Sequence, residues 1–447
     1  STAQLPRIAE LGCNTLWLLP LEDRSPYHPR DYYKFMDGIG TGDEYRRLVN
    51  TAKALKLRVW QDIVPHGGSN TYPRAIEHPE WLAQEEDGST LSYWCFDFNW
   101  PEWIDYMKDV ARHYVRDYGI DGYRMDACSG SKINNWNPAI PYARASMARS
   151  QGGLAMQRAI REGVREHNAE GSTLAEAGNG IFGVTSDAIY DFAMCYSVFP
   201  AMRAAEPTQF VANFRRWLHE QQYGNVPDLV TLRHIESHDS LRAEWQYGPA
   251  PMRAALAVSA WIKGMPMIYQ DAEDGHGPVI KKIFALRNGL YEQDAPSVDY
   301  LAVTTAPGVF ACLRQAELPA PPDGAFAWEQ RGGWRASVAL VNFNPTETAC
   351  PVVLPLSALP ATLRQGKSCR DLWSGQVLPL RPSADGQALE TNLSLPPFGL
   401  AMLRLGSSEL PPMPPARLAA APRLLPYELS LIDSIGKAQA LNDALNN

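Results

Sequence analysis

The chain has 447 residues and a formal net charge of -8. Its length exceeds one ordinary domain but fits one large barrel with a smaller domain, and 45% hydrophobic with 20% charged residues is an ordinary globular composition. The acidic balance argues against a nucleic-acid-binding protein, which needs a basic stripe, and no apolar run is long enough to span a bilayer.

Short apolar runs alternate with amphipathic stretches through the first two thirds of the chain. The pattern predicts buried strands at 14–19, 57–64, 120–125, 173–175, 188–192, 229–235 and 266–269, and helices at 43–55, 103–118, 153–167, 211–221 and 252–262. Such alternation indicates βα units and a parallel sheet. Seven strands are one short of a (β/α)8 TIM barrel. Because Ser1 begins inside a predicted helix, we expect the absent strand to be the first one.

The pattern changes at about residue 299. Short alternating runs such as Val309–Leu313 and Ser337–Phe343 are separated by Pro- and Gly-rich turns, which predicts a small antiparallel all-β domain. We therefore expect three parts: a barrel at 1–298 with a short inserted loop at 67–101, a β-sandwich domain at 299–406, and a Pro/Ala-rich linker with an amphipathic helix at 407–447.

Asp126 stands at the end of the predicted strand 120–125. The C-terminal ends of the strands are where a (β/α)8 barrel places its chemistry. Arg124 lies two residues earlier and therefore projects to the same side of the strand. A guanidinium beside a carboxylate lowers the carboxylate's pKa, which suits a nucleophile. The alternative is an Arg–Asp pair that only holds the strand end.

Other carboxylates stand at or near the ends of other predicted strands, at Asp62, Glu176 and Asp239. Cleavage of a glycoside with retention needs a nucleophilic carboxylate and an acid about 5–5.5 Å apart. Asp126 is the better anion, whereas Glu176 has only Leu, Ala and Gly neighbours and fits proton donation. Asp239, beside His238, would stabilise an oxocarbenium-like state. The alternative is that these carboxylates cap the helices that follow them.

The motifs around these residues resemble glycoside hydrolase family 13, the α-amylase family, from about residue 5 to residue 405. DGYRMDA resembles the nucleophile motif, which implies Asp126 as nucleophile and Arg124 as its partner. LAEAG resembles the acid/base motif and implies Glu176 as proton donor. ESHDS resembles the third motif, with Asp239 as transition-state stabiliser and His238 as a ligand of a substrate hydroxyl.

Further segments extend the resemblance. QDIVPHGG resembles the first motif through Asp62, and SPYHPRDYY resembles the segment with the substrate-stacking tyrosine, here Tyr27. GMPMIYQDAE resembles the last barrel strand, and DLWSG the C-terminal domain. The resemblance implies a retaining α-glycoside hydrolase that acts on α-glucans or α-glucosides through a covalent glycosyl-enzyme. An α-glucan transglycosylase or isomerase is the alternative, and a non-catalytic carbohydrate-binding relative is a further one.

Two motifs depart from the family's pattern. The first motif usually ends in Asn then His, and this chain has His66 and Gly67. Because that Asn helps to bind a structural calcium in many members, its replacement disfavours calcium without excluding it, and we assign no residue to a metal. His66 is the candidate to contact the sugar in place of the family's His. In the nucleophile motif, Ser129 and Gly130 replace a Lys-His pair of many α-amylases.

The sequence implies no cofactor. A dinucleotide enzyme is disfavoured because no GxGxxG follows a strand. The seven cysteines include no CxxC pair, which indicates reduced thiols rather than disulfides or zinc and slightly favours the cytoplasm. The expected partner is an oligosaccharide or α-glucoside, with no nucleic acid and no membrane, and the oligomeric state is left open.

Overall fold

The computed structural model describes residues 2–140, 146–226, 229–318 and 333–405. The predicted linker and helix at 407–447 lie outside these residues. Within them, the chain forms two compact units, the first from Ser1–Tyr190 and Asp228–Val230, the second from Asp191–Pro227 and Thr231–Arg417. The units divide near Tyr190 and not at 298, so the division of the chain into domains at 298/299 stays a prediction.

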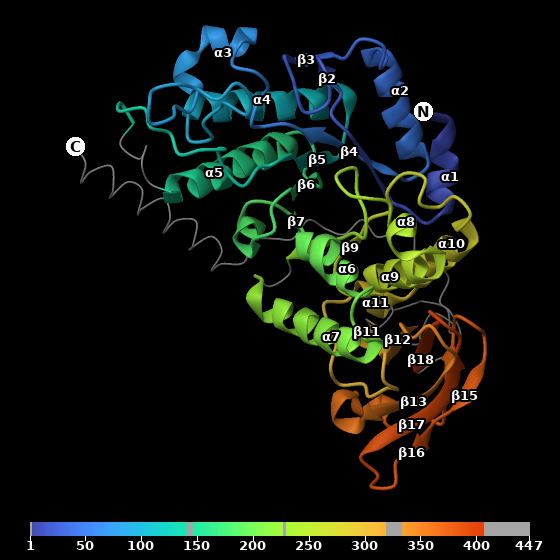
Figure 1. Cartoon of the computed structure of the whole chain (residues 1–447). Helices are drawn as coiled ribbons and strands as arrows, with labels where there is room; N and C mark the ends of the chain where they lie inside the picture. The colour runs from blue at the N-terminus through green and yellow to red at the C-terminus, as the bar shows by residue number, and fades with distance from the viewer. Residues whose placement is uncertain (1, 141–145, 227–228, 319–332, 406–447) are drawn as a thin grey trace. The chain divides into compact units, whose positions relative to one another are not determined.

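The first unit alternates strands and helices. Its elements are α1 (Leu5–Glu10), β1 (Thr15–Leu18), β2 (Glu22–Asp23), β3 (Asp31–Phe35), α2 (Gly42–Ala54), β4 (Arg58–Ile63), α3 (Pro73–Glu77), α4 (Pro101–Tyr118), β5 (Gly122–Met125), α5 (Ser146–Arg165), β6 (Ser172–Ala175) and β7 (Ala188–Tyr190). Figure 1 shows α4 and α5 side by side, where Arg112 pairs with Glu166. Helix α2 begins at a capping box, in which Thr41 and Glu44 satisfy each other's backbone N–H groups.

The second unit continues the barrel elements and adds the β domain. The barrel elements are α6 (Phe199–Ala201), α7 (Pro207–Gly224), β8 (Val230–Arg233), α8 (Ala243–Tyr247), α9 (Pro249–Trp261), β9 (Met265–Pro266), α10 (Gly277–Gly289) and α11 (Tyr291–Asp294). The strands that follow are β10 (Val298–Asp299), β11 (Val309–Leu318), β12 (Gly333–Asn342), β13 (Thr348–Pro355), β14 (Ser368–Asp371), β15 (Val377–Pro379), β16 (Arg381–Pro382), β17 (Ala388–Leu395) and β18 (Leu400–Leu405).

The main sheet has seven strands in the order β1-β4-β5-β6-β7-β8-β9. Strands β1, β4, β5, β6 and β7 pair in parallel in that order, and β8 pairs in parallel with β9, as βα units require. The register pairs Met125 of β5 with Ala175 of β6, and the backbone N–H of Glu176 donates to the Met125 carbonyl at 3.0 Å. The two residues that leave these strands, Asp126 and Glu176, therefore lie at one edge of the sheet.

The β domain consists of two antiparallel sheets, β10-β11-β12-β18-β14-β15 and β13-β17-β16. Apolar side chains from both sheets form one core, with Val338 and Leu340 from the first and Val352, Leu354 and Leu389 from the second. Sheets that bury their inner faces against each other are typical of a β-sandwich.

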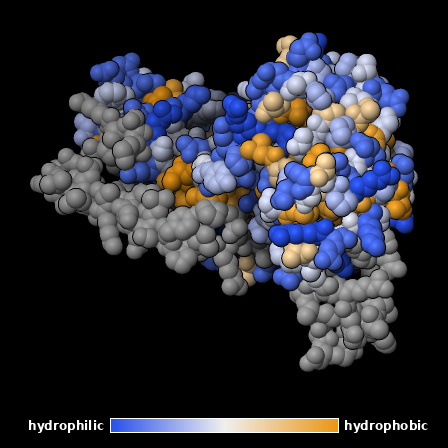
Figure 2. Space-filling model, turned by 90° about the horizontal axis from the view of Figure 1, so that it is seen from below, coloured by the Kyte–Doolittle hydropathy of each residue, from blue (hydrophilic) through white to orange (hydrophobic). Residues whose placement is uncertain are grey.

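The predicted fold class, a seven-stranded TIM-barrel sheet followed by an all-β domain, is confirmed. Element ends differ from the prediction. The last strand was expected at 266–269, but β9 has only Met265 and Pro266. Among the described residues, no helix is long and apolar enough to cross a membrane. In Figure 2, hydrophilic and hydrophobic residues are mixed over the face in view.

Candidate active site

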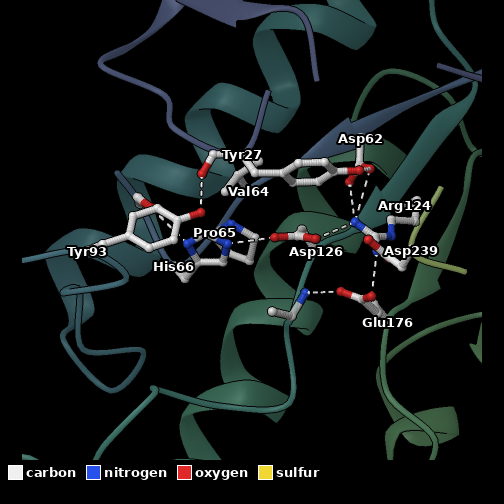
Figure 3. A network of polar contacts seen from close by, with 12 residues as sticks. Tyr27, Asp62, Val64, Pro65, His66, Tyr93, Arg124, Asp126, Glu176 and Asp239 are labelled. Carbon is white, nitrogen blue, oxygen red and sulfur yellow. Dashed lines mark hydrogen bonds and ion pairs between the residues drawn. The ribbon is translucent and has the colours of Figure 1, made fainter. Parts of the chain in front are cut away.

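Arg124 of β5 is the centre of a buried charged cluster. Its Nη1 donates to both Asp62 oxygens at 3.0 Å and to Asp126 Oδ1, and its Nη2 pairs with Glu176 Oε1 at 2.7 Å. Asp62 comes from β4, while Asp126 and Glu176 directly follow β5 and β6. Figure 3 shows the guanidinium between the three carboxyl groups. The structure thus brings together four residues that the sequence predicted as site residues.

Aromatic rings enclose the Arg124 guanidinium. The ring centres of Trp17, Tyr27 and Tyr190 lie 5.3, 5.8 and 5.5 Å from its central carbon, within the range of cation–π attraction. Tyr27 also donates its hydroxyl to Asp62 at 3.0 Å, and Arg124 Nε donates to the Tyr190 hydroxyl at 3.2 Å. Sequence reasoning predicted Tyr27 but missed Trp17 and Tyr190. Both lie on strands it had recognised, so an aromatic residue on a barrel strand was the available signal.

Asp126 is held as an anion. Burial acts to raise its pKa, but a hydrogen bond from His66 and the charge of Arg124 outweigh burial and lower the pKa to about 2. A carboxylate with so low a pKa stays ionised in neutral solution, as a nucleophile requires.

Glu176, in contrast, tends to keep its proton. Burial raises its pKa to about 7, and the neighbouring Asp126 charge adds to this, although Arg124 opposes both. Its Oε2 accepts a hydrogen bond from the Ala127 backbone N–H at 2.6 Å. Ala127 has a φ of 40°, a strained conformation for a residue with a side chain, and such strain concentrates at functional sites. The turn after Asp126 therefore positions Glu176.

The charge balance of the cluster explains why the pKa of Asp126 is low and that of Glu176 is high. Three carboxyl groups face one guanidinium, and burial also raises the pKa of Asp62 well above its ordinary value. Full ionisation would place an excess of negative charge in a buried site, which is strongly disfavoured. The pair Asp126 and Glu176 therefore supplies one anion and one proton donor, the combination that acid-assisted nucleophilic substitution needs.

His66 follows β4 and contacts Asp126 directly. Its Nε2 lies 2.6 Å from Asp126 Oδ2, and its Nδ1 lies 2.7 Å from the Gly67 carbonyl oxygen. Gly67 has a φ of 74°, and a Cβ built there would lie 2.1 Å from the Phe96 ring. No side chain fits at position 67, so the family's usual His is sterically excluded there.

Gly130 departs from the family's pattern for a similar reason. Its φ is 149°, and a Cβ there would lie 2.2 Å from the backbone oxygen of Arg149 in α5. The loop after β5 packs too closely on α5 to hold a larger residue at position 130. The departure is therefore a matter of close backbone packing.

Calcium does not fit the residues at the first motif. His66 stands where the resemblance places an asparagine ligand, and its ring nitrogens face Asp126 and Gly67 instead. In the parts of the chain that the structure describes, no three His, Cys, Asp or Glu side chains gather as a metal site would require.

The inserted loop 67–101 supplies an aromatic wall. The ring of Trp94 lies over His66 with ring centres 4.4 Å apart, and Tyr93 donates its hydroxyl to the backbone oxygen of Tyr27. Trp81 of the same loop is instead buried and packs on the buried Trp103 of α4, with ring centres 5.7 Å apart. Only part of this Trp-rich loop therefore borders the cluster.

Asp239 and His238 belong to the second compact unit, where they follow β8. They pair with each other, His238 Nε2 to Asp239 Oδ2, at 3.2 Å. The Asp239 side chain is 53% exposed, and its backbone N–H donates to Ser237 Oγ at 3.2 Å. An exposed carboxylate here is free to meet a ligand, and its role beside Asp126 stays a prediction.

Among the comparisons with known proteins, no family model matches the chain. Alpha-amylase 2 of Dictyoglomus thermophilum is 30% identical over 151 residues, 30% of this chain and 27% of that protein. A cyclomaltodextrinase of a Bacillus species is 21% identical over 324 residues, 65% of this chain and 55% of that protein. The matched segment spans about a third or less of the curated relatives that match first.

Solved structures resemble the chain over most of its length. The maltogenic alpha-amylase AmyB from Thermotoga neapolitana superposes with a TM-score of 0.68 at 16% identity, covering 90% of this chain and 93% of that one. An alpha-amylase from Geobacillus thermoleovorans, complexed with acarbose, gives a TM-score of 0.66 at 16% identity and covers 91% and 92%. These likenesses establish the fold.

Proposed function

We propose that this chain is a member of glycoside hydrolase family 13, the α-amylase family, and that it is a retaining α-glycosidase that acts on α-glucans or α-glucosides. The names of its relatives include amylases, a cyclomaltodextrinase and glucan-branching enzymes, which supports an α-glucan substrate. The bound acarbose of the Geobacillus thermoleovorans enzyme supports an oligosaccharide ligand.

One observation carries the proposal. Asp126 and Glu176 contact the two terminal nitrogens of the same Arg124 guanidinium, yet their pKa values are driven apart, to about 2 and about 7. A structural ion pair needs no such difference, whereas a double-displacement glycosidase needs an anion and an acid side by side. The proposed reaction uses these side chains alone, and no cofactor is part of it.

In the first step, an Asp126 carboxylate oxygen forms a bond to the anomeric carbon. The bond from that carbon to the leaving oxygen breaks, and Glu176 gives its proton to the leaving oxygen. Arg124 holds both carboxyl groups in place, and Asp62 and Tyr27 hold Arg124 and border the sugar site. Asp239 stabilises positive charge on the sugar ring, and His238 binds a sugar hydroxyl.

In the second step, Glu176 acts as a base. It takes a proton from an incoming water or sugar hydroxyl, whose oxygen bonds to the anomeric carbon while the bond to Asp126 breaks. Water gives hydrolysis, and a sugar hydroxyl gives transglycosylation. The two outcomes share every residue named here and differ only in the acceptor.

Product analysis tests the proposal. Wild type and Asp126→Asn are incubated with maltooligosaccharides and, separately, with sucrose and trehalose. We expect shorter sugars with wild type and none with the variant. Longer or isomeric sugars that also depend on Asp126 would identify a transglycosylase or isomerase. If folded wild type turns over none of these α-glucosides, the proposed enzymatic function is wrong and a carbohydrate-binding role is favoured.

A further inference from the structure

His66 makes two short contacts with groups that only accept hydrogen bonds. Its side chain is 3% exposed. The Gly67 carbonyl oxygen lies 2.7 Å from Nδ1, and the Asp126 carboxylate oxygen Oδ2 lies 2.6 Å from Nε2. The first distance lies at the short end of the range for an N–H···O hydrogen bond, and the second lies just below it, so both contacts are close. Figure 3 shows the ring in line with the Asp126 carboxylate.

A neutral imidazole cannot satisfy both contacts. It carries one N–H donor, and its second nitrogen is an acceptor. If Nδ1 donates to Gly67, the bare Nε2 lone pair faces the Asp126 carboxylate, and if Nε2 donates, a bare Nδ1 faces the carbonyl oxygen. Either arrangement sets two lone pairs against each other at hydrogen-bond distance. The geometry therefore calls for one proton more than a neutral His66 and an ionised Asp126 hold together.

The groups around His66 determine where this proton resides. The charged and titratable groups that face it are Asp126 and Arg124 from β5 and Tyr93 from the loop 67–101. The Tyr93 hydroxyl already donates to the backbone oxygen of Tyr27, and the remaining face is covered by Trp94. Burial lowers the pKa of His66 below its ordinary value, and the charge of Arg124 acts in the same direction, while the hydrogen bond and charge of Asp126 oppose this shift without reversing it. The proton therefore depends on the ionised Asp126.

We propose that His66 is a positioning residue, which as an imidazolium donates its Nε2–H to the nucleophile Asp126, so that the nucleophile of this chain works as a histidine–aspartate dyad. The inference rests on the proposed function, and it concerns the second chemical step. When the bond between the anomeric carbon and Asp126 breaks, its electron pair returns to the carboxylate. The Nε2–H of His66 stabilises that returning charge without leaving the ring.

The dyad has opposite effects on the two steps. In the first step the imidazolium stabilises the free carboxylate and so makes it a weaker nucleophile. In the second step it makes the same carboxylate a better leaving group. Hydrogen bonds from charged donors are about twice as strong as neutral ones, so we expect loss of the charge to slow deglycosylation about 10-fold, which corresponds to about 1.4 kcal/mol.

The kinetic test compares wild type with His66→Gln, whose amide still donates a hydrogen bond but does not titrate. The substrate is an α-glycosyl fluoride of a sugar that wild type turns over, because fluoride leaves without acid help and makes deglycosylation rate-limiting. In wild type, we expect kcat to pass through a maximum between the pKa values of His66 and Glu176, because the step needs a protonated His66 and an ionised Glu176. In His66→Gln, kcat should be lower and the falling limb should vanish.

A matched control uses a half-buried histidine outside the cluster. His78 pairs with Glu80 and stacks on Trp81, and His78→Gln should retain the wild-type pH profile. Identical profiles for wild type and His66→Gln would overturn the dyad while leaving the proposed function intact. A wild type without turnover would instead overturn the proposed function.

A second measurement needs no activity. Nitrogen NMR of protein labelled at its nine histidines follows the ring protons, and the absence of one signal in His66→Gln or in His66→Asn identifies His66. We expect both ring nitrogens of His66 to be protonated at the acid end of the titration. The proton should be lost at higher pH in wild type than in Asp126→Asn, because the Asn carries no charge. A His66 that keeps one bare nitrogen at every pH at which the protein is folded would contradict the dyad.

Discussion

Two buried arginine–aspartate pairs, one in each compact unit, are built differently. Arg124 of β5 faces three carboxyl groups and three aromatic rings. Arg233 of β8 pairs with Asp191 and donates its Nε to the Lys263 carbonyl at 2.9 Å, while the Met194 backbone N–H donates to Asp191. The first pair shares its contacts with two further carboxyl groups, whereas the second is completed by backbone groups and by the Gln221 side-chain amide, which donates to Asp191 at 3.4 Å.

The comparison separates a structural pair from a chemical one. Arg233 and Asp191 balance each other's charge and are completed by groups that never titrate, so their purpose is to join β8 to the segment that follows β7. Arg124 is outnumbered by carboxyl groups, so one of them keeps a proton that a reaction can use. The number and kind of groups around an Arg–Asp pair, more than the pair itself, indicates function.

Asp126→Asn should show the largest effect. The substitution removes the nucleophile, and we expect kcat to fall at least about 10⁴-fold, as for other enzymes whose nucleophile is lost. The variant should fold, because Asn has the same shape and Asp62 still pairs with Arg124. Steady-state kinetics together with circular dichroism checks both statements. A folded Asp126→Asn with near wild-type kcat would place the nucleophile elsewhere.

Glu176→Gln should show the next largest effect, and one that depends on the substrate. Loss of a general acid reduces turnover by about 10²–10⁴-fold when the leaving group is a sugar. An α-glycosyl fluoride needs no proton, so its glycosylation rate should change little. Comparing kcat/KM for the two substrates isolates the acid role. An equal loss for both would mean that Glu176 only holds Arg124 in place.

Asp191→Asn should show the reverse pattern. It leaves the buried Arg233 without its counter-charge, which typically destabilises a protein by roughly 3–5 kcal/mol. Urea unfolding should therefore show a lower midpoint, while kcat of the folded variant stays close to wild type. A fall in kcat without a change in stability would contradict the assignment of Arg233 and Asp191 as a purely structural pair.

The pH dependence should be the mildest effect. Burial raises the pKa of Glu176 to about 7, and the group must be protonated to act as an acid. The kcat/KM for a sugar leaving group should be highest below pH 7 and should fall about tenfold per pH unit above it. Asp126 has a pKa of about 2 and stays ionised at all but strongly acidic pH, so its protonation should not lower kcat/KM at mildly acidic pH. A flat profile above pH 7 would show that Glu176 is not the acid.

The sequence predicted the fold and the positions of Asp126, Glu176 and Arg124 because these depend on local pattern. Each carboxylate directly follows a short buried strand, and strands that alternate with helices pair in parallel. The residue spacing also places Arg124 on the same side as Asp126. The comparisons confirm the fold class, whereas the family and the role of each residue stay predictions.

Other features depend on long-range packing that no local pattern carries. The contact between His66 and Asp126 joins residues 60 positions apart, and it follows from the positive φ of Gly67 and the Phe96 ring above it. The strained turn at Ala127, which aims a backbone N–H at Glu176, is likewise a product of the folded chain. Trp17 and Tyr190 lie on strands that the sequence predicts, but their approach to Arg124 depends on how those strands pack.

The most direct test of the account is the mass of the covalent intermediate. A fluorinated α-glycosyl fluoride, whose added fluorine slows the second step, is incubated with wild type and the protein is analysed by mass spectrometry before and after digestion. We predict an increase by one sugar residue on the peptide that contains Asp126, and none in Asp126→Asn. An active enzyme that gains no mass, or that carries the sugar on another residue, would contradict the assignment of Asp126 as the nucleophile.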